Sequence, residues 1–134
     1  MSLQIMENYC KKNDFWIEKL PGKMVITVRF GNRTQTCEAF TTLNGTDRKK
    51  VLKVISKFGR FKGFKMDRMK ELIIDIAQYV YCRPELDESD GTLLIAGCTL
   101  DEAASESEIA YLLYEVAFVA DTFEKKFFKG QDAY

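Results

Sequence analysis

The spacing of the apolar residues changes along the chain, and this change limits the folds available to it. Between residues 15 and 58 the apolar residues fall in short, near-alternating segments, which predict strands. From residue 66 onward two long segments repeat their apolar residues every three or four positions, which predicts amphipathic helices. This mixture of a strand-rich part and a helix-rich part indicates an α+β fold.

The first half of the chain holds four strand-like segments separated by turn residues. Pro21-Gly22, Gly31-Asn32 and Asn44-Gly45 stand between or after them. Such short connections cannot carry the chain across to a parallel neighbour, so we expect an antiparallel meander of three or four strands. The expected strands are residues 15–20, 24–30, 34–43 and 51–58.

Two helices are expected on either side of this meander. Residues 3–12 fit a short amphipathic helix, and residues 66–80 fit a second helix of about four turns. Pro84 limits the second helix because proline disfavours a helical residue before it. The apolar stripe of the second helix consists of Met66, Met69, Ile73, Ile76 and Val80, widened by Leu72 and Ala77.

A strand pair and a long helix complete the expected order. Asp90-Gly91 is a strong hairpin signal between residues 84–88 and the apolar segment 92–100. Ser105 and Glu108 form a capping box, which predicts the start of a helix that we expect to end at Gly130. The core stripe of this helix consists of Ile109, Leu112, Leu113, Val116, Ala120, Phe123 and Phe127.

The predicted fold class is α+β, in the order helix, antiparallel strand meander, helix, strand pair and long C-terminal helix. We expect the helices to pack on a face of one mixed sheet. Residues 1–134 are expected to form a single domain, since this length supplies one core. Residues 1–5 resemble a cloning leader, and residues 131–134 are expected to form a frayed tail.

This order resembles the type III secretion chaperone-like superfamily, including the YbjN-like proteins of bacteria. The similarity is strongest from Lys50 to Phe128, where a strand leads to a helix, then to Asp90-Gly91-Thr92-Leu93-Leu94-Ile95 and a final helix. The resemblance lies in topology and hydrophobic rhythm. It implies a non-enzymatic, often dimeric, protein-binding module of the cytoplasm, chaperone-like or regulatory. Secretion chaperones are typically acidic, whereas this chain has a net charge of zero, which favours the YbjN-like branch.

The residue types present argue against catalysis. The chain contains no histidine, which excludes every mechanism that relies on imidazole. It also lacks the sequence motifs of nucleophile elbows and phosphate-binding loops. We therefore expect no enzyme activity and no cofactor. An alternative is that the acidic segment 85–90 carries out acid–base chemistry. The pattern of this segment is more typical of a solvated loop.

The cysteines and the apolar runs indicate the compartment. Cys10, Cys37, Cys82 and Cys98 include no closely spaced pair, so we expect no metal site and four reduced thiols, as in the cytoplasm. No apolar run approaches the roughly 20 residues that cross a bilayer, so we expect no membrane partner.

The net charge of zero hides a strong segregation of charge along the chain. Residues 46–70 hold ten basic residues and two acidic ones, a net charge of +8. Residues 71–124 hold thirteen acidic residues and one basic residue, a net charge of −12. Such blocks can steer charged partners or simply solvate the outer faces of the fold, and the sequence leaves open whether they lie on opposite faces.

Within the basic block, aromatic rings alternate with cations. This pattern makes residues 48–70 a candidate for binding nucleic acid or polyphosphate, with rings stacking on bases and cations neutralising phosphates. The alternative is that Phe58, Phe61 and Phe64 anchor the segment in the core. The candidate residues for an anionic partner are Lys57, Arg60, Phe61, Lys62, Phe64 and Lys65.

The last helix carries a second apolar row beside its core stripe, made of Tyr111, Tyr114 and Phe118. A helix that is apolar on two sides is either sandwiched within its fold or covered by a partner. We predict that this row mediates self-association. The expected partners are a second copy of the chain, giving a homodimer, and an unidentified protein.

Overall fold

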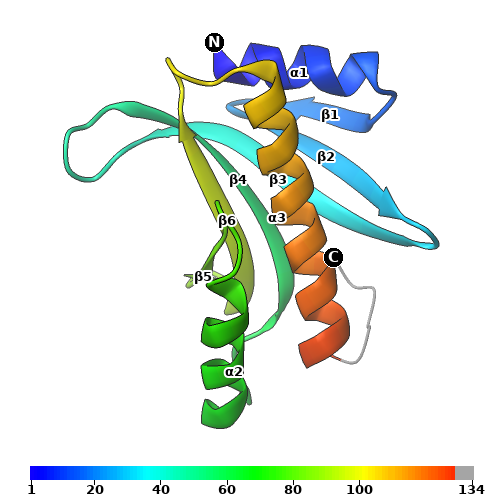
Figure 1. Cartoon of the computed structure of the whole chain (residues 1–134), viewed down its shortest axis with the longest axis vertical. Helices are drawn as coiled ribbons and strands as arrows, with labels where there is room; N and C mark the ends of the chain where they lie inside the picture. Colours follow the sequence, from blue (N-terminus) through cyan, green and yellow to red (C-terminus); the bar gives the residue numbers. More distant parts are fainter. Residues whose placement is uncertain (129–134) are drawn as a thin grey trace.

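The computed structural model describes residues 1–128, in which three helices accompany one six-stranded sheet (Figure 1). The predicted frayed tail at 131–134 and the predicted helix end at Gly130 lie outside these residues. The elements in chain order are α1 (Ser2–Lys12), β1 (Trp16–Leu20), β2 (Lys23–Phe30), β3 (Arg33–Leu43), β4 (Lys50–Arg60), α2 (Met66–Ile76), β5 (Arg83–Asp87), β6 (Thr92–Leu100) and α3 (Glu106–Phe127).

This order confirms the α+β class, the strand meander and the strand pair, but the expectation of a mixed sheet is wrong. The strand order is β1-β2-β3-β4-β6-β5, and each of these pairings is antiparallel. β4 and β5 run in the same direction, as a crossover through α2 requires, but β6 lies between them. The turn at Asp90-Gly91, where Gly91 has a φ of +71°, folds β6 back into that place.

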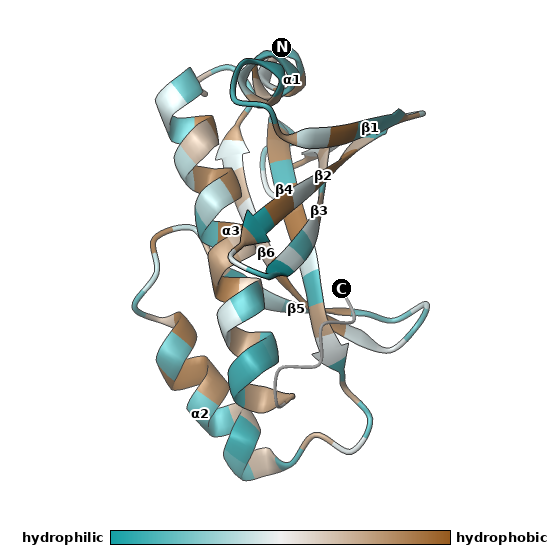
Figure 2. Cartoon of the chain, turned by 90° about the vertical axis from the view of Figure 1, so that its right-hand side faces the viewer, coloured by the Kyte–Doolittle hydropathy of each residue, from teal (hydrophilic) through white to brown (hydrophobic). Residues whose placement is uncertain are grey.

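Helix α3 supplies more of the buried hydrophobic residues than any other single element. Its predicted stripe packs on the sheet, with Ile109, Leu112 and Val116 fully buried. All three helices lie on the same side of the sheet (Figure 2). Gly97 on β6 allows the close approach of α3, because a Cβ atom there would lie 2.7 Å from Leu112 Cδ1.

The start of α3 follows the sequence signal. Ser105 is the N-cap, and its hydroxyl oxygen accepts a hydrogen bond from the Glu108 backbone N–H at 3.2 Å. This contact satisfies one of the N–H groups that a helix start leaves without an intrahelical partner. The capping box therefore identified the boundary correctly.

Helix α2 is shorter and less buried than its periodicity predicts. It ends at Ile76 rather than Val80, and among its apolar residues only Leu72 and Ile76 are buried. The backbone N–H groups of Val80 and Tyr81 donate to the buried carboxylate of Glu115 on α3, at 3.3 and 2.7 Å. These bonds hold the segment that follows the helix against α3, while α2 itself projects beyond the sheet (Figure 1).

Candidate functional site

The predicted aromatic row lies on the outer side of α3. Tyr111, Tyr114 and Phe118 are 53%, 55% and 37% exposed, although the same helix buries the six residues of its core stripe from Ile109 to Phe123. The alternative that the fold sandwiches this row is therefore wrong. Three partly exposed aromatic rings on one helix form an apolar surface of the kind that marks interaction sites.

Neighbouring rings hold the aromatic row in place. The Tyr114 and Phe118 rings stack with centroids 5.7 Å apart, and Phe30 at the end of β2 meets both edge-on at 6.1 and 6.2 Å. Tyr81 lies 5.9 Å from Tyr111. Side chains ordered in advance lose less conformational entropy when a partner covers them.

A second exposed apolar surface lies on and after α2. It consists of Met66, Ile73, Ile74 and Val80, and we call it the α2 ridge. Met66 is 83% exposed and Val80 74%, whereas the sequence predicted that both would belong to a buried stripe. The helical period was correct, but α2 extends past the sheet, so most of its apolar stripe has no core to face.

The basic and acidic blocks lie next to each other instead of on opposite faces. β4 lies beside β6 and one strand away from β5, so its lysines reach the carboxylates of the acidic block. Lys53 Nζ lies 2.8 Å from Glu85 Oε1, and Lys57 Nζ lies 2.6 Å from Asp90 Oδ2. Much of the charge segregation in sequence is therefore neutralised within the fold.

These ion pairs also bear on the acid–base alternative for segment 85–90. The hydrogen bond from Lys57 is the main cause that lowers the pKa of Asp90, to about 2. Burial raises the pKa of Glu85, but bonds from Lys53 and Arg83 outweigh it, so this pKa is also lowered. Carboxylates that stay ionised near neutral pH are poor general acids.

The other basic residues contribute to a hollow between the end of β4, the start of α2 and the end of α3. It has a volume of about 390 Å³. Four of the six candidates for an anionic partner meet here, namely Arg60, Lys62, Phe64 and Lys65. Lys57 and Phe61 are not among its lining residues. We call this site the basic hollow; its lining consists of Arg60, Lys62, Gly63, Phe64, Lys65, Arg68, Phe127 and Phe128.

Two lining residues of the basic hollow come from the far end of the chain. Phe127 belongs to the predicted core stripe, and no site role is predicted for Phe128. Both rings instead close around Phe64, with Phe128 stacked on it at 5.6 Å. No local pattern could have joined residues more than sixty positions apart, and only the packing of α3 beside β4 brings them together.

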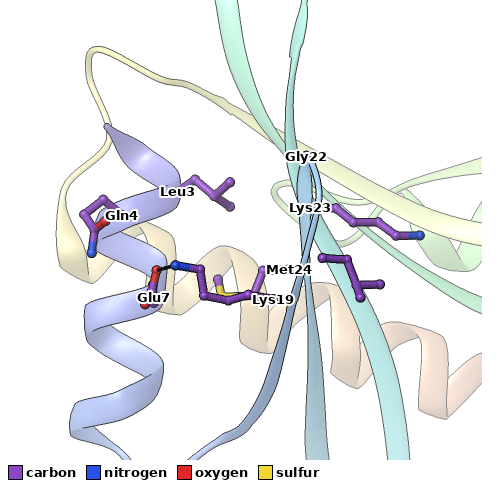
Figure 3. A pocket seen from close by; sticks show the side chains of 8 residues that line it. Leu3, Gln4, Glu7, Lys19, Gly22, Lys23 and Met24 are labelled. Atoms are coloured by element: carbon purple, nitrogen blue, oxygen red, sulfur yellow. Dashed lines mark ion pairs between the residues drawn. The ribbon is translucent and has the colours of Figure 1, made fainter.

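A further hollow, of about 230 Å³, lies between α1 and the β1–β2 hairpin (Figure 3). Two of its polar lining residues form an ion pair, with Glu7 Oε1 3.1 Å from Lys19 Nζ, and Lys11 outside the lining also contacts Glu7, at 2.8 Å between its Nζ and Glu7 Oε2. Leu3, from the segment that resembles a leader, is among its lining residues. No local sequence pattern predicts this hollow, because its lining comes from α1 and from both strands of the hairpin.

The described residues show no group of three or more potential metal ligands placed to hold an ion. All four cysteines are free thiols. Burial raises the pKa of Cys10 to about 11 and that of Cys37 to about 12, so both are neutral near pH 7 and poor nucleophiles. Within residues 1–128, no helix combines the length and the apolar character needed to cross a membrane.

Sequence comparison identified no relative: no protein-family model and no curated protein matches the chain. Structure comparison did. The type III secretion chaperone SycH of Yersinia pestis, solved in complex with a stable fragment of YscM2, is similar at a TM-score of 0.59 and 15% identity. The alignment covers 91% of this chain and 98% of that chain.

A second similar structure is that of the HopA1–SchA chaperone–effector complex. Its TM-score is 0.53 at 13% identity, covering 84% of this chain and 88% of that chain. These two structural similarities, each covering most of this chain and most of the compared chain, confirm the fold resemblance predicted from the element order. The chain therefore has the α+β fold of the type III secretion chaperones.

Proposed function

We propose that this protein is a non-enzymatic, chaperone-like or regulatory module that binds other proteins and forms a homodimer through the aromatic row. The observation that carries the proposal is the exposure of Tyr111, Tyr114 and Phe118 on the helix that builds the core. Similar structures solved as complexes with protein partners support a binding role.

The exposed apolar area of the aromatic row determines how much it can contribute to the free energy of association. At about 150–250 Å² per aromatic side chain, the exposed parts present roughly 300 Å² of apolar surface. Burying that area at about 25 cal/mol per Å² yields about 7 kcal/mol per copy before association costs. A stable interface buries about 800 Å² on each partner, so the row acts as its centre, with Phe30 and Tyr81 at its margin.

The proposed partners are a second copy and an unidentified protein. A dimer that covers the aromatic row leaves the α2 ridge exposed, and we assign that ridge to the second partner. An exposed set of large aliphatic side chains on a helix is suited to an apolar groove of another protein.

We also propose a bacterial, cytoplasmic protein of the YbjN-like branch. Four free thiols are typical of a reducing compartment. The net charge of zero fits the YbjN-like branch better than the acidic secretion chaperones.

The proposal is tested by the molar mass in solution, measured by size exclusion with light scattering. We expect the wild type to have the mass of two chains and Tyr114→Ala with Phe118→Ala to have the mass of one. The matched control is Trp16→Ala with Phe61→Ala, which removes two exposed rings elsewhere and should remain a dimer. A monomeric wild type, or a dimer unaffected by the first pair, would refute it.

A second candidate function is the binding of nucleic acid or polyphosphate through residues 48–70. It is favoured by Arg60, Lys62 and Lys65, for which no ion pair with a described residue is present. It predicts salt-sensitive retention on heparin and on single-stranded RNA. Charge reversal of these three residues should abolish retention, whereas Lys57→Glu should change it little because Lys57 is paired with Asp90.

A further inference from the structure

We propose that the basic hollow binds an acidic segment of a protein partner, a stretch of chain rich in Asp and Glu. This inference rests on the proposed protein-binding function and names the chemistry of one site that serves it. It differs from nucleic-acid binding, which uses the same cations but also needs free ring faces.

The charge of the hollow is the first argument. Several cations of the basic block outside the hollow are paired, namely Lys49 with Glu102, Lys53 with Glu85 and Lys57 with Asp90. By contrast, Arg60 and Lys62 have no ion pair within residues 1–128, and the same holds for Lys65. These three like charges line one concave surface, so a bound anion relieves their mutual repulsion.

The shape of the hollow is the second argument. Its volume of about 390 Å³ falls at the lower end of the range for ligand pockets, which is about 300–1,000 Å³. The hollow is therefore larger than a single small anion would fill. Phe64, Phe127 and Phe128 form its apolar lining. A Glu side chain matches this surface, because its methylene groups can contact the rings while its carboxylate reaches a cation.

The state of the rings decides between an acidic peptide and a nucleic acid. Phe64 stacks on Phe128, whose edge meets Phe58 at 6.0 Å between centroids. The Arg68 guanidinium lies 4.6 Å from the centre of the Phe127 ring and covers its face. Because these faces are engaged within the fold, they are poor platforms for stacked bases. The cations remain available, and they suit carboxylates.

The test is fluorescence anisotropy with a fluorescein-labelled oligoglutamate peptide at low ionic strength. The loss of three exposed charge pairs predicts that Arg60→Glu, Lys62→Glu and Lys65→Glu together weaken binding about threefold or more. The matched control is Arg29→Glu, Arg48→Glu and Lys50→Glu, which changes the net charge equally at exposed residues outside the hollow. It should change the affinity by less than about twofold at moderate salt.

Two further ligands separate the sources of negative charge. An oligouridylate and inorganic tripolyphosphate should each bind more weakly than oligoglutamate at equal total charge, because neither uses the apolar lining as a peptide does. The triple Gln variant of the same three residues should lose binding while its melting temperature stays unchanged. This variant guards against a loss of binding caused by misfolding.

Several outcomes would overturn the inference. They are no binding of oligoglutamate by the wild type, an equal loss in the matched control, or tighter binding of the oligouridylate or of tripolyphosphate. Failure here is distinct from failure of the proposed dimer. If the protein is a dimer that does not bind oligoglutamate, only the proposal of an acidic ligand is refuted. If it is a monomer that binds oligoglutamate, only the proposal of self-association is refuted.

Discussion

Gly97 shows how a single residue on β6 determines the distance between the sheet and α3. A Cβ atom there would lie 2.7 Å from Leu112 Cδ1 and 3.0 Å from Val116 Cγ2, both in the core stripe. Side chains in a close-packed core have little room to move away. The sequence does not reveal this role, because a glycine within a strand pattern carries no information about the helix that will cover it.

We expect Gly97→Ala to destabilise the protein by about 1–3 kcal/mol through overpacking against α3. Urea unfolding measures this change, with Gly45→Ala as the matched control. A Cβ atom at Gly45 has no neighbour within 4 Å, and its backbone is not left-handed, so the control should stay within about 0.5 kcal/mol. Equal effects of the two substitutions would show that α3 does not pack closely on β6.

The Lys57–Asp90 pair makes part of the stability depend on pH. The lowered pKa of Asp90, about 2 against a reference of 3.8, means that the folded state favours the ionised carboxylate. The stabilisation is complete above the reference value and disappears as the pH falls toward 2. Asp90→Asn keeps an acceptor for the Thr92 N–H group and removes only the charge.

We expect the wild type to melt at a higher temperature than Asp90→Asn at pH 6, and we expect most of this difference to be lost by about pH 2. Thermal unfolding monitored by circular dichroism across this range provides the measurement. A difference that stayed constant with pH would mean that the aspartate acts through something other than its charge.

At the scale of elements, α2 shows where sequence reasoning succeeds and where it stops. The period of three and four predicted a helix over this segment, and a helix forms there. The period could not reveal that the helix extends beyond the sheet, nor that Glu115 from a distant segment would bind the backbone of Val80 and Tyr81 after it. By contrast, signals contained within a few residues, such as Ser105 with Glu108 or Asp90-Gly91, placed their elements correctly.

The two sides of α2 should respond differently to truncation. Leu72→Ala removes a fully buried side chain and should cost about 2–5 kcal/mol. Ile73 is the next residue and is 56% exposed, so Ile73→Ala should lower the free energy of unfolding by less than about 1 kcal/mol. Chemical denaturation of both variants tests this contrast. Similar losses would indicate that the α2 ridge is covered in solution.

At the scale of the whole molecule, long-range pairing neutralises part of the charge that the sequence segregates. The order of the residues reveals the charge blocks, but only the strand order β4-β6-β5 brings Lys53 to Glu85. The same packing leaves the aromatic row and the α2 ridge exposed, and it leaves three cations of the basic hollow without an ion pair within residues 1–128. The sequence identified the aromatic row because one helix contains it, and it missed Phe127 and Phe128 because the basic hollow joins distant segments.

The central claim is that the aromatic row contacts a second copy of the chain, and photo-crosslinking tests it most directly. Benzoylphenylalanine replaces Tyr114 in one preparation and the exposed Trp16 on β1 in another. After irradiation we expect a covalent species with the mass of two chains from position 114 and none from position 16. Absence of that species at position 114, or equal crosslinking at both positions, would contradict the claim.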